Sequence, residues 1–245
     1  MMPHDSFWDL VGERVSAFRG DVAGATEDSL VLEDGSMVRT DILLAGTGWD
    51  TGYSFLTAAQ VHDLGLPHDV VDDSIDDSRV WQQLLSLADS TIVRDYPILA
   101  HPPEETRVWT IKRRTPARLY QGIAPLNDDS IVFLGQARMA NGFLRAEAQA
   151  IWATAFFDRR VKMGSVEDAR EKVAYMNAFS RRRYPYDRDG VGVNFSKDFI
   201  WYTDSLLVEA GMTSHRRLWW EDETEPLVMS DLEGCAREYS EMKCE

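Results

Sequence analysis

Residues 30–56 form the stretch that most restricts what this 245-residue chain can fold into. The apolar run 30–32 is followed by Asp34-Gly35, a dipeptide typical of a type I′ hairpin turn, which needs positive φ at both central positions. The continuous apolar run 42–45 then predicts a short strand buried on both faces. Glycines let the backbone turn sharply after that strand, at Gly46, Gly48 and Gly52.

The glycine-rich segment 46–52, GTGWDTG, has two interpretations. A phosphate-binding loop would need G-x-G-x-x-G running directly from a strand into a helix. Here the third glycine comes one residue late, and Asp50 would place a carboxylate where a pyrophosphate should bind. The fingerprint occurs nowhere else in the sequence, so we disfavour a phosphate loop.

A second informative block spans residues 119–157. Leu119–Ile123 and Ile131–Leu134 are predicted strands, separated by the turn-rich segment 125–129. A loop from Gln136 to Gly142 then enters a helix whose apolar residues recur on one face. A helix N-terminus carries partial positive charge and unpaired N–H groups, which suit developing negative charge on a bound ring.

Both blocks resemble segments of flavin-containing monooxygenases and related Baeyer–Villiger enzymes. The first is similar to the family's D-x-x-x-x-A-T-G-Y/W motif, which lies between its nicotinamide- and flavin-binding domains. This sequence departs from the motif by the extra Gly46. The matching residues are Asp41, Ala45, Thr47, Gly48 and Trp49.

The second block resembles the family's Y-x-G-I-x-P … I-x-F-I-G-Q … E-x-Q-A-x-W segment. The matches run from Tyr120 through Gly135 and Gln136 to Gln149 and Trp152. The resemblance implies FAD and NADPH as cofactors. The cofactor-binding residues that it implies are Asp41, Thr47, Gly48, Trp49, Gly135, Gln136, Asn141 and Gly142. The alternative is that Gln136 and Asn141 only cap the helix.

The resemblance implies an α/β fold with α+β character, a partial version of the family's two-dinucleotide-domain architecture. We divide the chain into a nicotinamide-domain-like region (1–56), a helical or loop insertion (57–118) and a flavin-domain-like region (119–245). The family motif comes late in its enzymes but early here, so the chain corresponds to a C-terminal part. Without a fingerprint it is not expected to hold a dinucleotide alone, and a second chain or self-association would cover its exposed sheet.

Other elements follow from local patterns. Residues 1–12 read as a frayed start, and Val15–Phe18, Asp21–Ala25 and Ser29–Glu33 as short strands. Helices are predicted after Asp77, with Val80, Trp81, Leu84, Leu85 and Leu87 inward, and after a capping box at Ser165, with Val166, Ala169, Val173 and Met176 inward. A third begins at Ser196 or Asp198, with Phe199, Ile200, Thr203, Leu206 and Leu207 inward, and Gly211 ends it; 229–242 is a last short helix.

Candidate catalytic residues are few. His101 stands in a proline-rich loop, where a lone histidine is more often a bystander than a base. His62 and His68 lie six residues apart with nothing nearby to complete a ligand set, so we predict no metal site. The catalytic candidates are Tyr53, His101, Asn141 and Arg145.

The formal net charge of −15 argues against nucleic acid and anionic membranes as general partners. No secretory signal or membrane-spanning apolar run is visible, and the two cysteines make no disulfide framework. We therefore expect a cytoplasmic protein.

Three functions remain open. The first is an FAD-dependent monooxygenase acting on a small apolar organic substrate, with its flavin-binding half supplied from elsewhere. The second is a flavin-independent cyclase, isomerase or dehydratase in small-molecule biosynthesis. Its pocket would be lined by Asp41, Tyr53, His101, Gln136, Asn141 and Arg145. The third is a non-catalytic partner subunit or remnant. Bound flavin in the purified protein would separate the first from the others.

Overall fold

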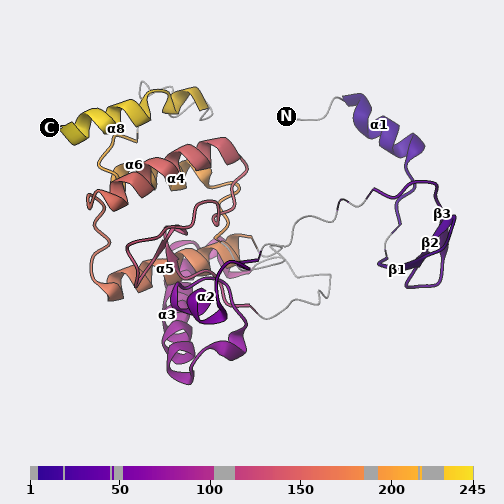
Figure 1. Cartoon of the computed structure of the whole chain (residues 1–245), viewed down its shortest axis with the longest axis horizontal. Coiled ribbons are helices and arrows are strands. Elements are labelled where there is room, and N and C mark those ends of the chain that lie inside the picture. Colours follow the sequence, from indigo (N-terminus) through magenta and orange to yellow (C-terminus); the bar gives the residue numbers. More distant parts are fainter. Residues whose placement is uncertain are drawn as a thin grey trace. The chain divides into compact units, whose positions relative to one another are not determined.

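The computed structural model describes residues 5–18, 20–44, 46, 52–101, 114–184, 193–214, 216 and 229–244. The chain forms two compact units, an N-terminal unit of Met1–Gly52 and a C-terminal unit of Tyr53–Glu245 (Figure 1). Helices and small antiparallel sheets occur together, which confirms the predicted mixture. The assignment of chain regions to nicotinamide and flavin domains stays a prediction.

The N-terminal unit consists of helix α1 (Asp5–Arg14) and the antiparallel sheet β1 (Val22–Ala25), β2 (Ser29–Leu32) and β3 (Met37–Arg39). Val31 pairs with Met37 across the β2–β3 hairpin. Gly35 has φ of +81°, as the predicted turn requires, whereas Asp34 does not have positive φ. The loop is therefore not type I′ but the three-residue kind, with glycine at its left-handed position.

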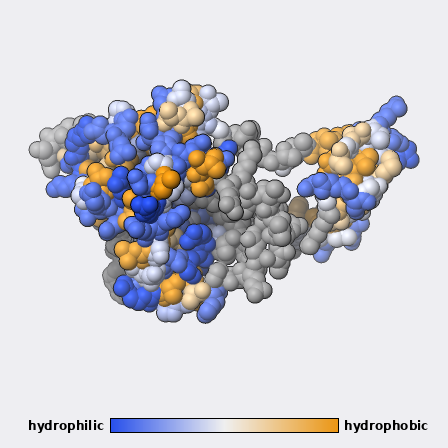
Figure 2. Space-filling model, turned by 90° about the horizontal axis from the view of Figure 1, so that it is seen from below, coloured by the Kyte–Doolittle hydropathy of each residue, from blue (hydrophilic) through white to orange (hydrophobic). Residues whose placement is uncertain are grey.

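Three predictions for this unit are wrong. Helix α1 replaces the frayed start, and Val15–Phe18 is irregular and exposed rather than a strand. Ile42, Leu43 and Leu44 are irregular as well, and Leu44 is 88% exposed instead of buried. A continuous apolar run forms a buried strand only where strands and layers cover it, and the sheet described here has one layer. Figure 2 shows apolar residues gathered on the surface of this unit.

The C-terminal unit begins with α2 (Ala58–Asp63), the short 3₁₀ helix η1 (Val70–Asp72) and the long helix α3 (Ile75–Asp95). The α3 helix is predicted correctly, but its N-cap is Ser74 rather than Asp77, which stands in the first turn and donates its N–H to Ser74 Oγ. Trp81, Leu84 and Leu85 pack inward with Ala88 and Ile92, whereas Val80 and Leu87 are exposed. Pro97 ends the region as predicted, in η2 (Pro97–Ala100).

The predicted strand pair in the second block is wrong in its bounds. The structure has a minimal hairpin of β4 (Leu119–Tyr120) and β5 (Ala124–Pro125), turned by Gln121 and Gly122, which both have positive φ. Residues Ile131–Leu134 form no strand, although Phe133 N donates to Ile123 O at 2.8 Å. The tight turn therefore comes before Pro125 rather than after it.

The remaining helices follow the predictions closely. They are α4 (Gly142–Phe157), α5 (Val166–Arg183), α6 (Phe199–Glu209), η3 (Met229–Leu232) and α8 (Cys235–Cys244). The Ser165 capping box is present, and Gly211 follows the end of α6 with φ of +82°. Val166 and Ile200 are exposed, contrary to the predicted inward faces.

Helix packing builds the core of the C-terminal unit. Helix α3 packs against α5, and α4 packs against α6. The main cluster includes the stacked rings of Phe195 and Tyr202, with centroids 4.5 Å apart, and the buried Trp152. Within the described part of the chain, no helix is long and apolar enough to cross a membrane.

Candidate functional site

The loop before α4 is fixed at its start by a chain of buried hydrogen bonds. Gly135 N donates to Gln149 Oε1 at 2.9 Å, and Gln149 Nε2 donates to the Tyr202 hydroxyl at 2.8 Å. Tyr202 in turn donates to Gln121 O at 2.7 Å. Gln149 is 0% exposed, so these partners satisfy both ends of a buried amide. These hydrogen bonds link the loop, helices α4 and α6, and the β4–β5 turn.

Gln136 is held by a residue far away in the sequence. The Tyr53 hydroxyl donates to Gln136 Oε1 at 2.8 Å. Burial raises the pKa of Tyr53 above its ordinary value, although the hydrogen bond to Gln136 and the charge of Arg114 oppose the rise. Tyr53 therefore acts as a neutral hydrogen-bond donor that orients the Gln136 amide.

Asn141 and Arg145 hold the end of the same loop. Asn141 Oδ1 accepts the N–H of Leu144 at 3.1 Å, so Asn141 is the N-cap of α4. Arg145 Nη1 donates to Ala137 O at 2.8 Å, which draws the loop onto the first turn of the helix. Asn141 therefore caps α4, and its contact with a cofactor stays a prediction. Gln136 makes no such cap, because its side-chain oxygen faces Tyr53 instead.

The start of α4 is open to solvent at Gly142. Gly142 is exposed, and a Cβ at this position would meet no atom within 4 Å, so a flat ring can approach the backbone. A pyrophosphate needs several glycine-bearing turns at a helix start, and the sequence contains no G-x-G-x-x-G.

Other predicted site residues lie elsewhere. Asp41 belongs to the irregular, exposed segment that ends the N-terminal unit. Thr47, Gly48 and Trp49 lie outside the described residues. His101 is exposed at the end of η2, and the described contacts do not join it to Gln136 or Asn141. The structure therefore brings together Tyr53, Gln136, Asn141 and Arg145 around one loop.

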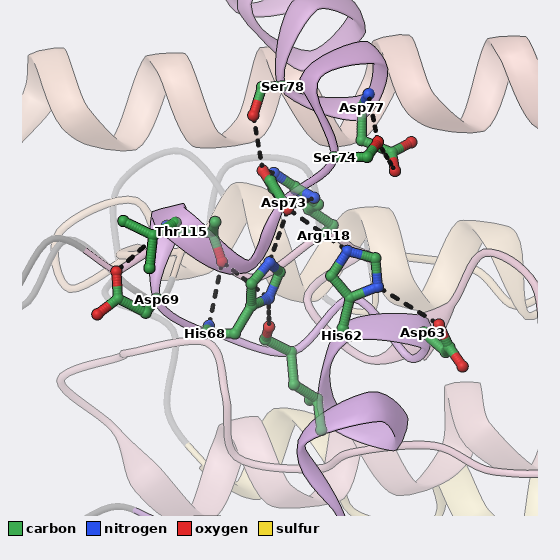
Figure 3. A network of polar contacts seen from close by, with 12 residues as sticks. His62, Asp63, His68, Asp69, Asp73, Ser74, Asp77, Ser78, Thr115 and Arg118 are labelled. Atoms are coloured by element: carbon green, nitrogen blue, oxygen red, sulfur yellow. Dashed lines mark hydrogen bonds and ion pairs between the residues drawn. The ribbon is translucent and has the colours of Figure 1, made fainter.

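Sequence reasoning missed a second polar cluster, on the connection between α2 and α3 (Figure 3). His68 Nε2 lies 2.7 Å from Asp73 Oδ1, and His62 Nε2 lies 3.6 Å from the same oxygen. The expectation that nothing near the two histidines completes a ligand set is therefore wrong. The sequence signal for this cluster is its spacing, because Asp73 lies only five residues after His68.

Asp73 is the centre of this cluster. Its side chain is 2% exposed, and Arg118 contacts both oxygens, Nη1 at 3.0 Å from Oδ1 and Nη2 at 2.5 Å from Oδ2. Burial raises the pKa of Asp73, but the hydrogen bonds from Arg118 and His68 outweigh it, so the pKa lies below its ordinary value. The carboxylate is therefore held charged inside the unit.

Comparison with known proteins finds FAD-dependent monooxygenases similar to this chain. It is 28% identical over 225 residues to an FAD-dependent monooxygenase from Pyrenophora dematioidea, covering 89% of this chain and 40% of that protein. It is 29% identical to FAD-dependent monooxygenases from Aspergillus nomiae and Aspergillus sclerotiorum, again over 89% of its length and over 38% and 39% of theirs. The chain is related to the FAD-dependent monooxygenases.

The match covers most of this chain but less than half of each relative. The chain spans about 40% of the length of the curated proteins that it matches. No family model matches the chain, and no solved structure matches it either. The resemblance read from the two motif blocks is confirmed at the level of the family relationship.

Proposed function

We propose that this chain supplies the ring-contacting, C-terminal-type part of an FAD-dependent monooxygenase that oxidises a small apolar organic molecule. The observation that carries the proposal is the match over 89% of the chain to proteins of that description. Bound FAD supplies the redox chemistry, with electrons from NADPH and an oxygen atom from O₂. The protein residues contribute position and electrostatics.

The loop before α4 performs this positioning. The start of α4 places partial positive charge where a reduced ring gathers negative charge. Gln136, oriented by Tyr53, offers a neutral amide to the polar edge of the ring. Arg145 keeps the loop against the helix, so these groups hold their places before the cofactor arrives.

The phosphate-binding loops would come from outside this sequence, either from another part of the same polypeptide or from a second one. The exposed apolar segment Ile42–Leu44 in the N-terminal unit is the kind of surface that a partner covers. We assign this chain and its partner to the cytoplasm and to the biosynthesis of small molecules. A second copy of this chain could cover the segment but would bring no fingerprint with it.

The test is to purify the chain alone and together with a neighbouring-gene chain that carries G-x-G-x-x-G fingerprints. We expect colourless protein alone, and a yellow complex that consumes NADPH when the two are expressed together. The Gln136→Leu variant should reduce flavin content of the complex without preventing its assembly. Turnover of an apolar substrate by the chain alone, without flavin, would instead support the cyclase or isomerase alternative.

A further inference from the structure

We propose that His62, His68 and Asp73 bind a divalent transition-metal ion of the zinc class. The two Nε2 atoms and one carboxylate oxygen all lie within 4.8 Å of one another (Figure 3). Two imidazoles and one carboxylate make a three-ligand set that leaves a further position for water. Such a nitrogen-rich set suits zinc, cobalt or iron(II) rather than magnesium or calcium, which prefer oxygen ligands.

Both histidine rings are oriented as metal ligands usually are. His68 Nδ1 lies 2.8 Å from Leu66 O, and His62 Nδ1 lies 3.3 Å from Asp63 Oδ1. Each Nδ1 therefore has an acceptor that fixes the ring and leaves Nε2 turned toward Asp73. Metal-binding histidines typically donate their second ring N–H to a carbonyl or carboxylate in this way.

The hydrogen bonding of His62 distinguishes a metal site from a simple ion-pair network. His68, Asp73 and Arg118 satisfy one another through hydrogen bonds. Among the described residues, however, the buried His62 Nε2 has no hydrogen-bond partner, although it lies 3.6 Å from Asp73 Oδ1. A buried polar nitrogen without a partner is costly, and a cation shared with Asp73 would supply the missing interaction.

Arg118 is compatible with this arrangement. Its Nη2 can keep the 2.5 Å bond to Asp73 Oδ2, while the 3.0 Å bond from Nη1 to Oδ1 would give way to the metal. An adjoining cavity of about 250 Å³ is lined by His62, by the carboxylate residues Asp63 and Asp77 and by the cations Arg118 and Arg170. Because His62 lines this cavity, water can reach the proposed site from that side.

A bound ion would hold the α2–α3 connection together. His62 lies in the last turn of α2 and Asp73 lies just before α3, while Arg118 reaches the same carboxylate from the segment leading into β4. The ion would cross-link two of these three segments. This role does not depend on the proposed flavin chemistry, so either proposal can fail without the other.

The test uses the full chain after chelator treatment and dialysis. We expect one equivalent of Co²⁺ to give the visible absorption of a low-symmetry, histidine-bound ion, Zn²⁺ to displace it, and Zn²⁺ to raise the melting temperature. His62→Ala removes one ligand but leaves the His68–Asp73–Arg118 contacts intact, so it should fold and lose the spectrum and the zinc-dependent shift. The matched control is His101→Ala, at an exposed histidine, which should bind as the parent does.

A second variant tests how the affinity for Zn²⁺ depends on the orientation of His62. Asp63→Asn weakens the group that orients His62, and the affinity for Zn²⁺ should fall about 10- to 100-fold. Absence of a cobalt spectrum and of a zinc-dependent shift in the parent would show an ion-pair network only and overturn the proposal. Equal binding by the parent and His62→Ala would overturn it as well, because the ion would then lie elsewhere.

Discussion

Tyr53 and Gln136 lie 83 positions apart in the sequence and are joined by a 2.8 Å hydrogen bond from the tyrosine hydroxyl to Gln136 Oε1. This bond ties the start of the C-terminal unit to the loop that enters α4. Tyr53 lies four residues after the first family-like motif, which ends at Trp49, and Gln136 belongs to the second. The contact itself lies within the C-terminal unit.

Replacing Tyr53 by Phe should loosen that loop. The change removes a half-buried hydrogen bond and should lower the free energy of unfolding by about 0.5–1.5 kcal/mol. A double-mutant cycle with Gln136→Leu, followed by urea denaturation, measures the coupling between the two side chains. Strictly additive effects of the two changes would show that the bond does not form in solution.

Replacing Gln149 by Leu should be more damaging. The substitution leaves Gly135 N without its partner and also removes the donor to the Tyr202 hydroxyl. Gly135 is exposed, so its N–H can turn to water, but loss of the buried Gln149–Tyr202 hydrogen bond should cost about 1–3 kcal/mol in urea denaturation. The matched control is Gln82→Leu, at an exposed position on α3, which should change stability little. Similar effects of the two changes would contradict the buried role of Gln149.

Variants of Asn141 can separate capping from cofactor contact. Asn141→Ala should lower stability by about 1 kcal/mol, because the N–H of Leu144 loses its acceptor. Asn141→Asp keeps an acceptor and should restore stability, yet it brings a negative charge to the proposed edge of the ring. Flavin content of the reconstituted complex should therefore fall in Asn141→Asp while its melting temperature holds. Unchanged flavin content would place the ring elsewhere.

The interhelical pair of Asp89 and Arg182 predicts an acid-dependent loss of stability. Arg182 binds both carboxylate oxygens of Asp89, and these hydrogen bonds lower the pKa of Asp89 more than its partial burial raises it. A carboxyl whose folded pKa is depressed stabilises the fold above its unfolded pKa, and that stability is lost as pH falls through the folded value.

Asp89→Asn tests this pair. The difference in unfolding free energy between parent and variant should be about 1 kcal/mol near pH 7 and should shrink below about pH 4. Urea denaturation between about pH 2.5 and 7 measures it. A difference that stays constant over this range would mean that the charge of Asp89 contributes nothing to the contact between α3 and α5.

Local patterns were enough to predict the helices. The spacing of apolar residues in α3 and the Ser165 capping box of α5 are encoded within single segments, so they do not depend on distant parts of the chain. Residues 42–44 and 131–134 form no strands, because an apolar run needs partners from distant segments to become one. The left-handed turn at Gln121 was missed because a non-glycine residue at positive φ carries no strong sequence signal.

The candidate site was predictable only in part. Gln136, Asn141 and Arg145 are close in sequence, so their shared loop followed from the strand–loop–helix pattern. The pairing of Tyr53 with Gln136 and the convergence of His62, His68 and Asp73 depend on how the chain folds back. Gln149 was matched to a family motif, but its buried bond to Gly135 appears only in the structure.

Binding of riboflavin and FAD by the isolated chain tests the central claim most directly. A surface that contacts only the ring should bind both molecules weakly and with equal affinity, because it offers nothing to the phosphates, and Gln136→Leu should weaken both equally. Quenching of flavin fluorescence, or chemical shifts of the Gln136 side-chain amide, would report the binding. FAD bound far more tightly than riboflavin, or neither bound at millimolar concentration, would contradict the account.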